Sequence, residues 1–212
     1  MKYNVSFELD FKRNPYRGKF MVLEGIDGSG KTTQAHNLVK ELEKKGLKVV
    51  YTKEPTDEVT GKMVRDFLIG KIKLPPVAFQ YLFAVDRAVH QEEIKKYLEK
   101  GTTVVSDRYF WSALIYGMLD VGAIGNKNEG QRLLAAYGIL SMYHRFIAPD
   151  YTFYLSVTAK TAMQRIAKKT EKIEKLREGY EWLAKKFAKE ITVVDGEGSV
   201  EEVTKRIVSK LT

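Results

Sequence analysis

One short stretch, residues 24–33, constrains the fold of this chain more than any other part of the sequence. It contains the pattern G-x-x-x-x-G-K-T, with Gly25, Gly30, Lys31 and Thr32 at the fixed positions. The glycines let several backbone N–H groups point at one anion, the lysine reaches the outer phosphates of a nucleotide, and the threonine hydroxyl can hold Mg²⁺. The predicted phosphate loop consists of Gly25, Ile26, Asp27, Gly28, Ser29, Gly30, Lys31 and Thr32.

The residues on either side of the loop support this interpretation. Residues 20–23 form an apolar run of the size of a buried strand. After the loop, Ala35, Leu38 and Leu42 have the spacing of one helix face, and Gly46 predicts the end of that helix. A strand, a glycine loop and a helix in this order are what a phosphate-binding loop requires.

Strands and helices alternate along the rest of the chain. Apolar and β-branched runs predict further strands over 47–51, 102–106, 151–157 and 191–194. Helices are predicted over 31–45, 58–69, 76–100, 109–119, 129–146, 159–169, 170–189 and at the C-terminus. Such alternation is typical of a parallel sheet covered on both faces, so we predict a three-layer α/β fold with five parallel strands flanked by helices.

The chain most simply divides into an N-terminal extension, residues 1–18, and one domain, residues 19–212. Within the extension, residues 5–9 alternate in polarity, which fits either an edge strand or a flexible tail. The hydrophobic fraction of 44% is enough for a core in one domain.

Composition also excludes several classes of protein. The sequence has no cysteine, which rules out disulfides and thiolate metal sites, and its three histidines lack the spacing of metal ligands. It contains no apolar run near 18 residues and no secretory signal at its start. We therefore expect a cytoplasmic protein without a membrane partner.

The net charge of +9 is concentrated in one segment. Residues 160–189 hold ten lysines and arginines against four glutamates, a net charge of +6. Because the excess is local, we do not expect nucleic acid as a partner. The segment is either a solvated helix face or a lid, over about 165–180, whose cations stabilise a transferred phosphoryl group.

Two charged residues follow the strand predicted over 102–106. In parallel sheets ligands bind at the carboxyl ends of the strands. Asp107 at such an end can hold Mg²⁺ together with Thr32, and Arg108 can clamp a second phosphate. Otherwise Asp107 would be a strand-end turn residue and Arg108 a surface arginine.

Asp27 is unexpected inside a phosphate loop, because its charge opposes that of the phosphates. Contact with a metal, a water or an acceptor group would explain it, and stabilisation of the loop is the alternative. Phe83 and Arg87 lie four residues apart on one helix face, where an aromatic ring and a guanidinium can hold a base. Without the loop, core packing and a surface salt bridge would explain the pair.

Taken together these motifs resemble the thymidylate kinase (dTMP kinase) family, from about residue 19 to the C-terminus. The resemblance rests on the phosphate loop with its aspartate, on Glu54-Pro55 and on the helix segment 82–87. It also rests on Asp107-Arg108-Tyr109 with Ser112 and Tyr116, and on residues 149–157 and 176–180.

The resemblance implies transfer of the γ-phosphate of ATP to dTMP, giving dTDP, with Mg²⁺ held by Thr32 and Asp107. It implies that residues 25–32 bind ATP and that the chain forms a homodimer. The implied dTMP-binding residues are Asp27, Glu54, Phe83, Arg87, Arg108, Ser112 and Tyr116. Of these, Phe83 would stack on thymine, Arg87 would bond to the base and Arg108 would bind the phosphate.

The implied catalytic residues are Asp27, Lys31, Arg108 and Arg165. Gly28 stands where some family members carry an arginine, and the lid then supplies the cation instead. Arg165 is the candidate, with Lys168 or Lys169 as substitutes. Two alternatives stay open: a kinase for another nucleoside monophosphate, and a P-loop nucleotide-binding regulator with weak hydrolysis.

Overall fold

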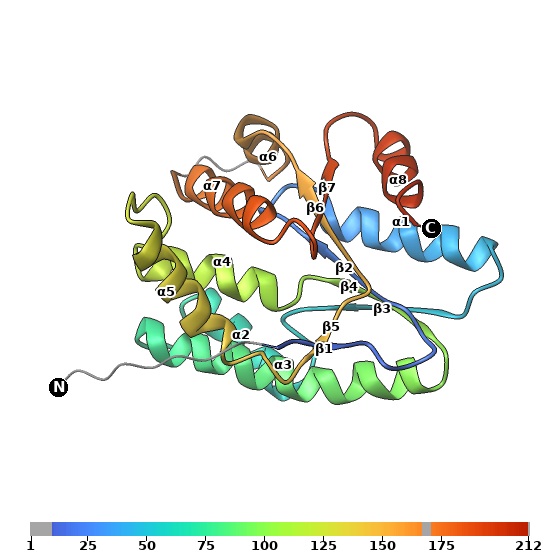
Figure 1. The fold of residues 1–212 in the computed structure, drawn as a ribbon, viewed down its shortest axis with the longest axis horizontal. Helices are drawn as coiled ribbons and strands as arrows, with labels where there is room; N and C mark the ends of the chain where they lie inside the picture. The colour runs from blue at the N-terminus through green and yellow to red at the C-terminus, as the bar shows by residue number, and fades with distance from the viewer. Residues whose placement is uncertain (1–9, 167–170, 212) are drawn as a thin grey trace.

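The fold is described by a computed structural model, which covers residues 10–166 and 171–211. Within these residues a five-stranded parallel sheet has the order β3-β4-β2-β6-β7, and helices cover both of its faces (Figure 1). The predicted three-layer α/β fold is confirmed.

The central strand of the sheet is the one that leads into the phosphate loop. The strands are β2 Phe20–Glu24, β3 Val49–Lys53, β4 Thr103–Asp107, β6 Tyr151–Ser156 and β7 Thr192–Asp195. β2 lies between β4 and β6, and all five of its residues are buried. In the register, Leu23 lies beside Asp107 and Phe153, so the loop after β2 is flanked by the ends of both neighbours.

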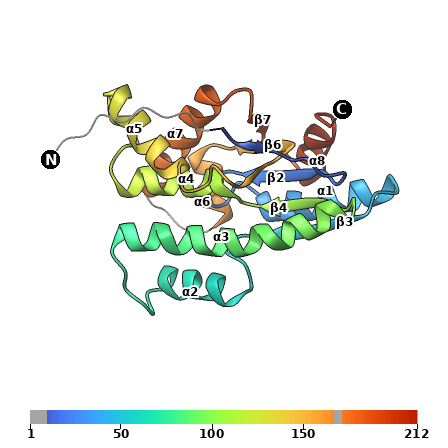
Figure 2. The ribbon, with the colours of Figure 1, turned by 60° about the horizontal axis from the view of Figure 1, so that its bottom comes forward.

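The helices form the two outer layers. They are α1 Lys31–Lys44, α2 Val59–Leu68, α3 Pro76–Glu99, α4 Phe110–Asp120, α5 Glu129–Leu140, α6 Ala159–Arg165, α7 Glu171–Lys186 and α8 Val200–Val208. The helices α1 and α8 cover one face of the sheet, while α3, α4 and α7 lie on the other (Figures 1 and 2). Helix α2 packs on α3, on the side away from the sheet (Figure 2).

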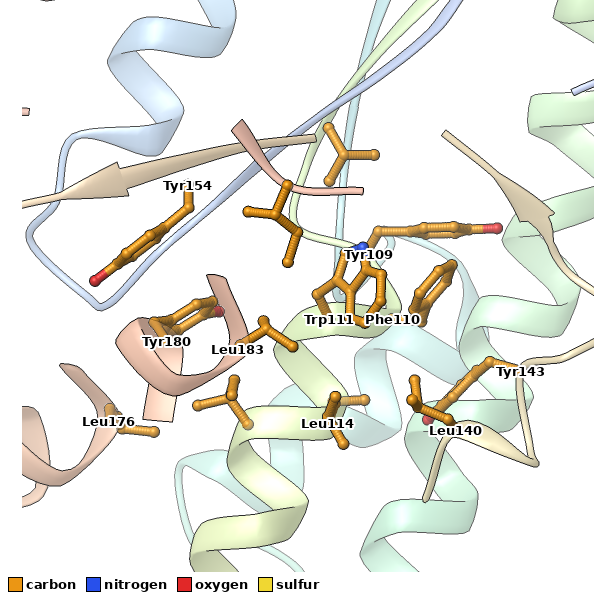
Figure 3. Close-up of a cluster of buried hydrophobic side chains, with 14 of the residues drawn as sticks. Tyr109, Phe110, Trp111, Leu114, Leu140, Tyr143, Tyr154, Leu176, Tyr180 and Leu183 are labelled. Atoms are coloured by element: carbon orange, nitrogen blue, oxygen red, sulfur yellow. The ribbon is translucent and has the colours of Figure 1, made fainter. Parts of the chain in front are cut away.

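The larger core lies under α3, α4 and α7 and is rich in aromatic side chains (Figure 3). Tyr154 of β6 stacks on Tyr180 of α7, with ring centroids 5.1 Å apart and planes 9° from parallel. Phe110 at the start of α4 packs against Trp111 and Tyr143. These contacts fix α7 and also α4, which begins at the carboxyl edge of the sheet just after β4.

The helix predicted over residues 129–146 is too long. In the structure it ends at Leu140, and turns continue to a two-residue strand, β5 Ile147–Ala148. This strand pairs in parallel with β1 Lys12–Arg13, which belongs to the N-terminal extension. The pairing of β5 depends on a segment that is distant in the sequence, so the local pattern of residues 129–146 could not reveal it and favoured a longer helix.

The described part of the extension, residues 10–18, packs on the domain. The ring of Phe11 stacks on that of Phe110, with centroids 5.3 Å apart, and the two terminal nitrogens of Arg13, Nη1 and Nη2, donate to the carboxylate of Glu190 at 2.9 and 2.8 Å. The predictions for residues 5–9 and for Lys168 and Lys169 lie outside the described residues. Among the described helices, none combines the length and the apolar character that crossing a membrane requires.

Candidate active site

The phosphate loop has the conformation that its glycines predict. Gly25, Gly28 and Gly30 have φ angles of 148°, 81° and 92°, a backbone conformation that residues with a Cβ rarely adopt. At Gly28 a Cβ would also lie 2.4 Å from the carbonyl oxygen of Ala162. The loop therefore needs glycine here, both for its turn and for its close approach to α6.

Lys31 lies in the loop as a buried cation, only 6% exposed. Its Nζ donates to the carbonyl oxygen of Ile26 at 2.8 Å and lies 3.4 Å from Oγ of Ser29. Burial, followed by the charge of Arg108, lowers the pKa of Lys31 to about 7, against the opposite effect of Asp107. An anion bound in the loop would favour its charged form.

Thr32 and Asp107 are brought together, as the sequence predicts. The Thr32 hydroxyl donates to Oδ2 of Asp107, while Oδ1 is buried and has no hydrogen-bond partner among the described residues. A hydroxyl and a carboxylate oxygen are ligands suited to Mg²⁺, which otherwise takes waters and substrate phosphates. The described residues contain no larger cluster of acidic or histidine ligands, and a nucleotide-bound Mg²⁺ does not need one.

A cavity of about 430 Å³ opens beside the loop, between α3, α4 and the segment after β3. It is lined by all of the residues for which the family resemblance implies dTMP binding: Asp27, Glu54, Phe83, Arg87, Arg108, Ser112 and Tyr116. Its lining also includes the apolar side chains Phe67, Leu68, Leu74 and Phe79. The cavity thus combines charged groups, which suit the phosphate of a nucleotide, with apolar side chains, which suit its base.

Arg108 lies at the boundary between the loop and this cavity. Its Nη2 donates to Asp27, its Nη1 lies 3.1 Å from Oγ of Ser112, and its φ of 77° turns the chain out of β4. Tyr116 completes the group, with its hydroxyl 3.4 Å from Asp27 and its ring 5.6 Å from the guanidinium carbon. Burial alone would raise the pKa of Asp27, but the charges of Arg108 and Lys31 outweigh it and lower the pKa.

Arg87 is the deepest cation of the cavity, with its side chain 2% exposed. Its Nε lies 2.5 Å from a carboxylate oxygen of Glu54, and its guanidinium lies over the rings of Phe83 at 5.3 Å and Tyr143 at 5.7 Å. Its buried Nε and Nη1 both lack a hydrogen-bond partner in the described parts of the chain, so Nε and Glu54 meet as an ion pair and not as a hydrogen bond. An unsatisfied buried donor that lines a cavity indicates a ligand acceptor group.

Arg165 does not line this cavity. It lines a second cavity of about 470 Å³ with Gly28, Gly30, Gly198 and Val200. Its Nη1 lies 3.4 Å from the carbonyl oxygens of both Gly28 and Ser29.

A different lid residue, Lys172 of α7, lines the first cavity. Its Nζ lies 5.4 Å from the ring centre of Tyr116. Each of the two cavities beside the loop is therefore lined by one cation of the predicted lid.

Three residues of the site were missed from the sequence. Glu24 at the end of β2 is buried and accepts hydrogen bonds from the backbone of Tyr109, from Ser112 and from the Tyr180 hydroxyl. Burial raises the pKa of the Glu24 carboxyl, although these bonds oppose the shift. The third is His90, whose Nδ1 lies 3.0 Å from the carboxylate of Glu54. A carboxylate that ends an apolar strand was the available signal for Glu24, whereas no local pattern distinguished Tyr180 or His90.

A phosphate loop at the end of a central parallel strand, with two cavities lined by loop residues, defines a P-loop kinase fold. Comparisons with known proteins agree. The family model described as thymidylate kinase matches residues 23–207. The chain belongs to the thymidylate kinase family.

The similar proteins cover almost the whole chain. The probable thymidylate kinase of Thermococcus gammatolerans is 36% identical over 209 residues, which cover 90% of this chain and 94% of that protein. The thymidylate kinase of Thermoanaerobacter pseudethanolicus is 34% identical over 203 residues, covering 91% and 96%. The structure of thymidylate kinase from Candida albicans has a TM-score of 0.74 at 23% identity and covers 91% of this chain and 90% of its own.

Proposed function

We propose that this chain transfers the γ-phosphoryl group of ATP to dTMP and releases dTDP and ADP. One observation carries the proposal: the cavity beside the phosphate loop is lined by an arginine that contacts the loop, Arg108, and by a second, buried arginine that packs on an aromatic ring, Arg87 with Phe83. This is the order of groups that a nucleoside monophosphate needs, with its phosphate towards the loop. Family membership supports thymine as the base.

In this reaction a phosphate oxygen of dTMP attacks the γ-phosphorus of ATP. One P–O bond forms as the bond to the β–γ bridging oxygen breaks, and ADP leaves with that electron pair. The protein has little covalent chemistry to perform, so catalysis depends on positioning and on positive charge.

The donor side is formed by residues 25–32. Backbone N–H groups of the loop and the N-terminus of α1 bind the phosphates, and Lys31 reaches the outer ones. The oxygens of Thr32 and Asp107 suit Mg²⁺, which would neutralise charge on the β- and γ-phosphates when bound.

The acceptor side is formed by Arg108, Asp27, Ser112 and Tyr116. Arg108 binds the dTMP phosphate, and its contacts with Asp27 and Ser112 fix the guanidinium before the substrate arrives. Tyr116 lies next to Asp27, in the position for the sugar, and disfavours a ribose hydroxyl.

The base binds between Phe83 and the apolar side chains of the cavity. The free Nη1 of Arg87 donates to a carbonyl oxygen of thymine, and Glu54 holds the guanidinium. Cytosine presents an amino donor where thymine has this oxygen, so Arg87 selects against it.

We propose residues 165–180 as the lid, of which 165–166 and 171–180 are among the described residues. We assign Arg165 to the donor side and Lys172 to the transferred phosphoryl group, because each lines the corresponding cavity. Closure of the lid would exclude water from the reactive phosphate.

A homodimer is supported by an exposed apolar stripe on α3. Val77, Tyr81, Val85 and Val89 are spaced by four residues and are 66%, 60%, 49% and 46% exposed. A contiguous apolar surface of this kind marks a protein–protein interface. Sedimentation velocity tests the assignment, and a monomer would contradict it.

The activity is tested by ADP release from ATP with and without dTMP. We expect release that depends on dTMP and that is mostly lost in Lys31→Ala. A P-loop regulator would hydrolyse ATP slowly without any effect of dTMP. Wild-type turnover in Lys31→Ala would refute the role of the loop.

A further inference from the structure

We propose that His90 is a positioning residue for base recognition. It holds the carboxylate of Glu54, and through Glu54 it fixes the guanidinium of Arg87 in the orientation that meets a carbonyl oxygen of the base. The inference rests on the proposed function, because it concerns the same acceptor cavity. It assigns a role to a buried histidine that does not itself line that cavity.

The contacts form a continuous chain across two elements. Nε2 of His90 lies 2.6 Å from the hydroxyl of Thr52 on β3, and its Nδ1 lies 3.0 Å from Oε1 of Glu54. The other oxygen of Glu54 lies 2.5 Å from Nε of Arg87. Because Arg87 and His90 are three residues apart, they lie on the same face of α3.

Hydrogen-bonding capacity fixes the direction of each bond. A carboxylate paired with Arg87 can only accept, so Nδ1 of His90 carries the proton that is donated to Glu54. Nε2 is then an acceptor, and the Thr52 hydroxyl donates to it. Thr52 thereby selects the tautomer of His90 that supports Glu54.

Burial makes this chain rigid. His90 is 2% exposed, Arg87 2% and Glu54 5%, so water cannot replace a lost partner at low cost. Without His90, Oε1 of Glu54 would lose the donor at 3.0 Å, and the carboxylate would be free to turn about its ion contact with Arg87.

The aromatic neighbours of Arg87 cannot replace this restraint. Phe83 and Tyr143 hold the guanidinium over their rings at 5.3 and 5.7 Å. Contact with a ring face limits the distance and tilt of the group but leaves its rotation in its own plane open. The ion pair between Nε and Glu54 is the contact that restrains the group in that plane, and His90 in turn holds Glu54.

The test compares three substitutions of His90 with dTMP, dUMP and dCMP as acceptors. His90→Phe keeps the ring volume and removes both bonds. The amide of His90→Asn can still donate to Glu54, from near the position of Nδ1, whereas that of His90→Gln reaches the position of Nε2, towards Thr52. Thermal unfolding and the KM for ATP report whether each variant is folded.

For His90→Phe we expect the ratio of kcat/KM for dTMP over dCMP to fall by about ten- to a hundredfold, the range for a hydrogen bond to a charged group. The loss should come mainly from a higher KM for dTMP. The ratio of dTMP over dUMP should stay unchanged, because both bases carry the same carbonyl oxygen. His90→Asn should retain most of the discrimination and His90→Gln should not.

Other outcomes separate the failure of this inference from that of the proposed function. A wild-type enzyme that does not phosphorylate dTMP overturns both. Loss of discrimination in Arg87→Gln, together with unchanged discrimination in His90→Phe, overturns the role of His90 and leaves the base site standing. If His90→Phe does not fold, equal discrimination in His90→Asn and His90→Gln overturns the role instead.

Discussion

Lys31 should take up a proton when nucleotide binds. In the free protein burial and Arg108 lower its pKa to about 7, so about half of the molecules carry a neutral Lys31 at pH 7. Bound phosphates lie against the ammonium group and raise its pKa towards the ordinary value. Binding therefore takes up about half a proton at pH 7 and about 0.9 at pH 8, and almost none at pH 5.5.

The sign of the pH dependence follows from this shift. The contribution of Lys31 to nucleotide affinity should be greatest below about pH 7 and should fall as the pH rises above it, because a neutral Lys31 must then take up a proton on binding. The fall should approach tenfold, or about 1.4 kcal/mol, for each pH unit.

Isothermal titration calorimetry with magnesium ADP, in buffers of different ionisation enthalpy, measures the uptake directly. At pH 8 the phosphates of this ligand are already ionised, so they release no compensating proton. Lys31→Arg is the matched control, since a guanidinium keeps its proton at these pH values and should abolish the uptake. A binding heat that does not depend on the buffer at pH 8, or equal uptake by Lys31→Arg, would refute the reasoning.

Two further substitutions test the packing around the site. Tyr180→Phe removes a 2.9 Å hydrogen bond to the buried Glu24, and the cost of about 1.5–3 kcal/mol should lower Tm by about 3–12 °C in calorimetry. In Gly61→Ala the new Cβ would lie 2.0 Å from the carbonyl oxygen of Thr56. Overpacking there should cost about 1–3 kcal/mol, and the displaced loop should raise the KM for dTMP.

Each of these has a control elsewhere in the chain. Tyr137→Phe changes a partly exposed tyrosine of α5 and should leave Tm nearly unchanged. Gly138→Ala adds a Cβ that meets nothing within 4 Å, so it should be neutral or stabilising by up to about 1 kcal/mol. Losses in the controls as large as those in Tyr180→Phe and Gly61→Ala would contradict the assigned contacts.

Residues at strand ends could be placed from the sequence because topology leaves them few positions. Once a parallel sheet is predicted, Asp27, Asp107 and Arg108 must meet at its carboxyl edge. Phe83 and Arg87 followed from the periodicity of one helix. These predictions needed only local patterns and one general rule of sheet geometry.

The residues that were missed depend on packing between distant segments. Glu24 meets Tyr180 across 156 positions, and His90 meets Glu54 across 36. Nothing local distinguishes Tyr180 from the other tyrosines of the chain. The end of α5 at Leu140 likewise depends on pairing with the N-terminal extension.

The separate roles of the two lid cations also could not be predicted from local sequence patterns. Arg165 and Lys172 belong to one basic segment, and its composition cannot tell which cation reaches which side of the loop. The answer depends on the packing of α7 against α4, because this packing brings Lys172 to Tyr116.

The most direct test of the account is the rate of diphosphate formation from ATP across a panel of nucleoside monophosphates. We expect dTMP to have the highest kcat/KM and dUMP to follow about 10- to 200-fold lower, because a methyl group in an apolar pocket contributes about 1–3 kcal/mol. dCMP should be far poorer, since its amino group opposes Arg87. Faster turnover of CMP or AMP than of dTMP would contradict the assignment of the acceptor site.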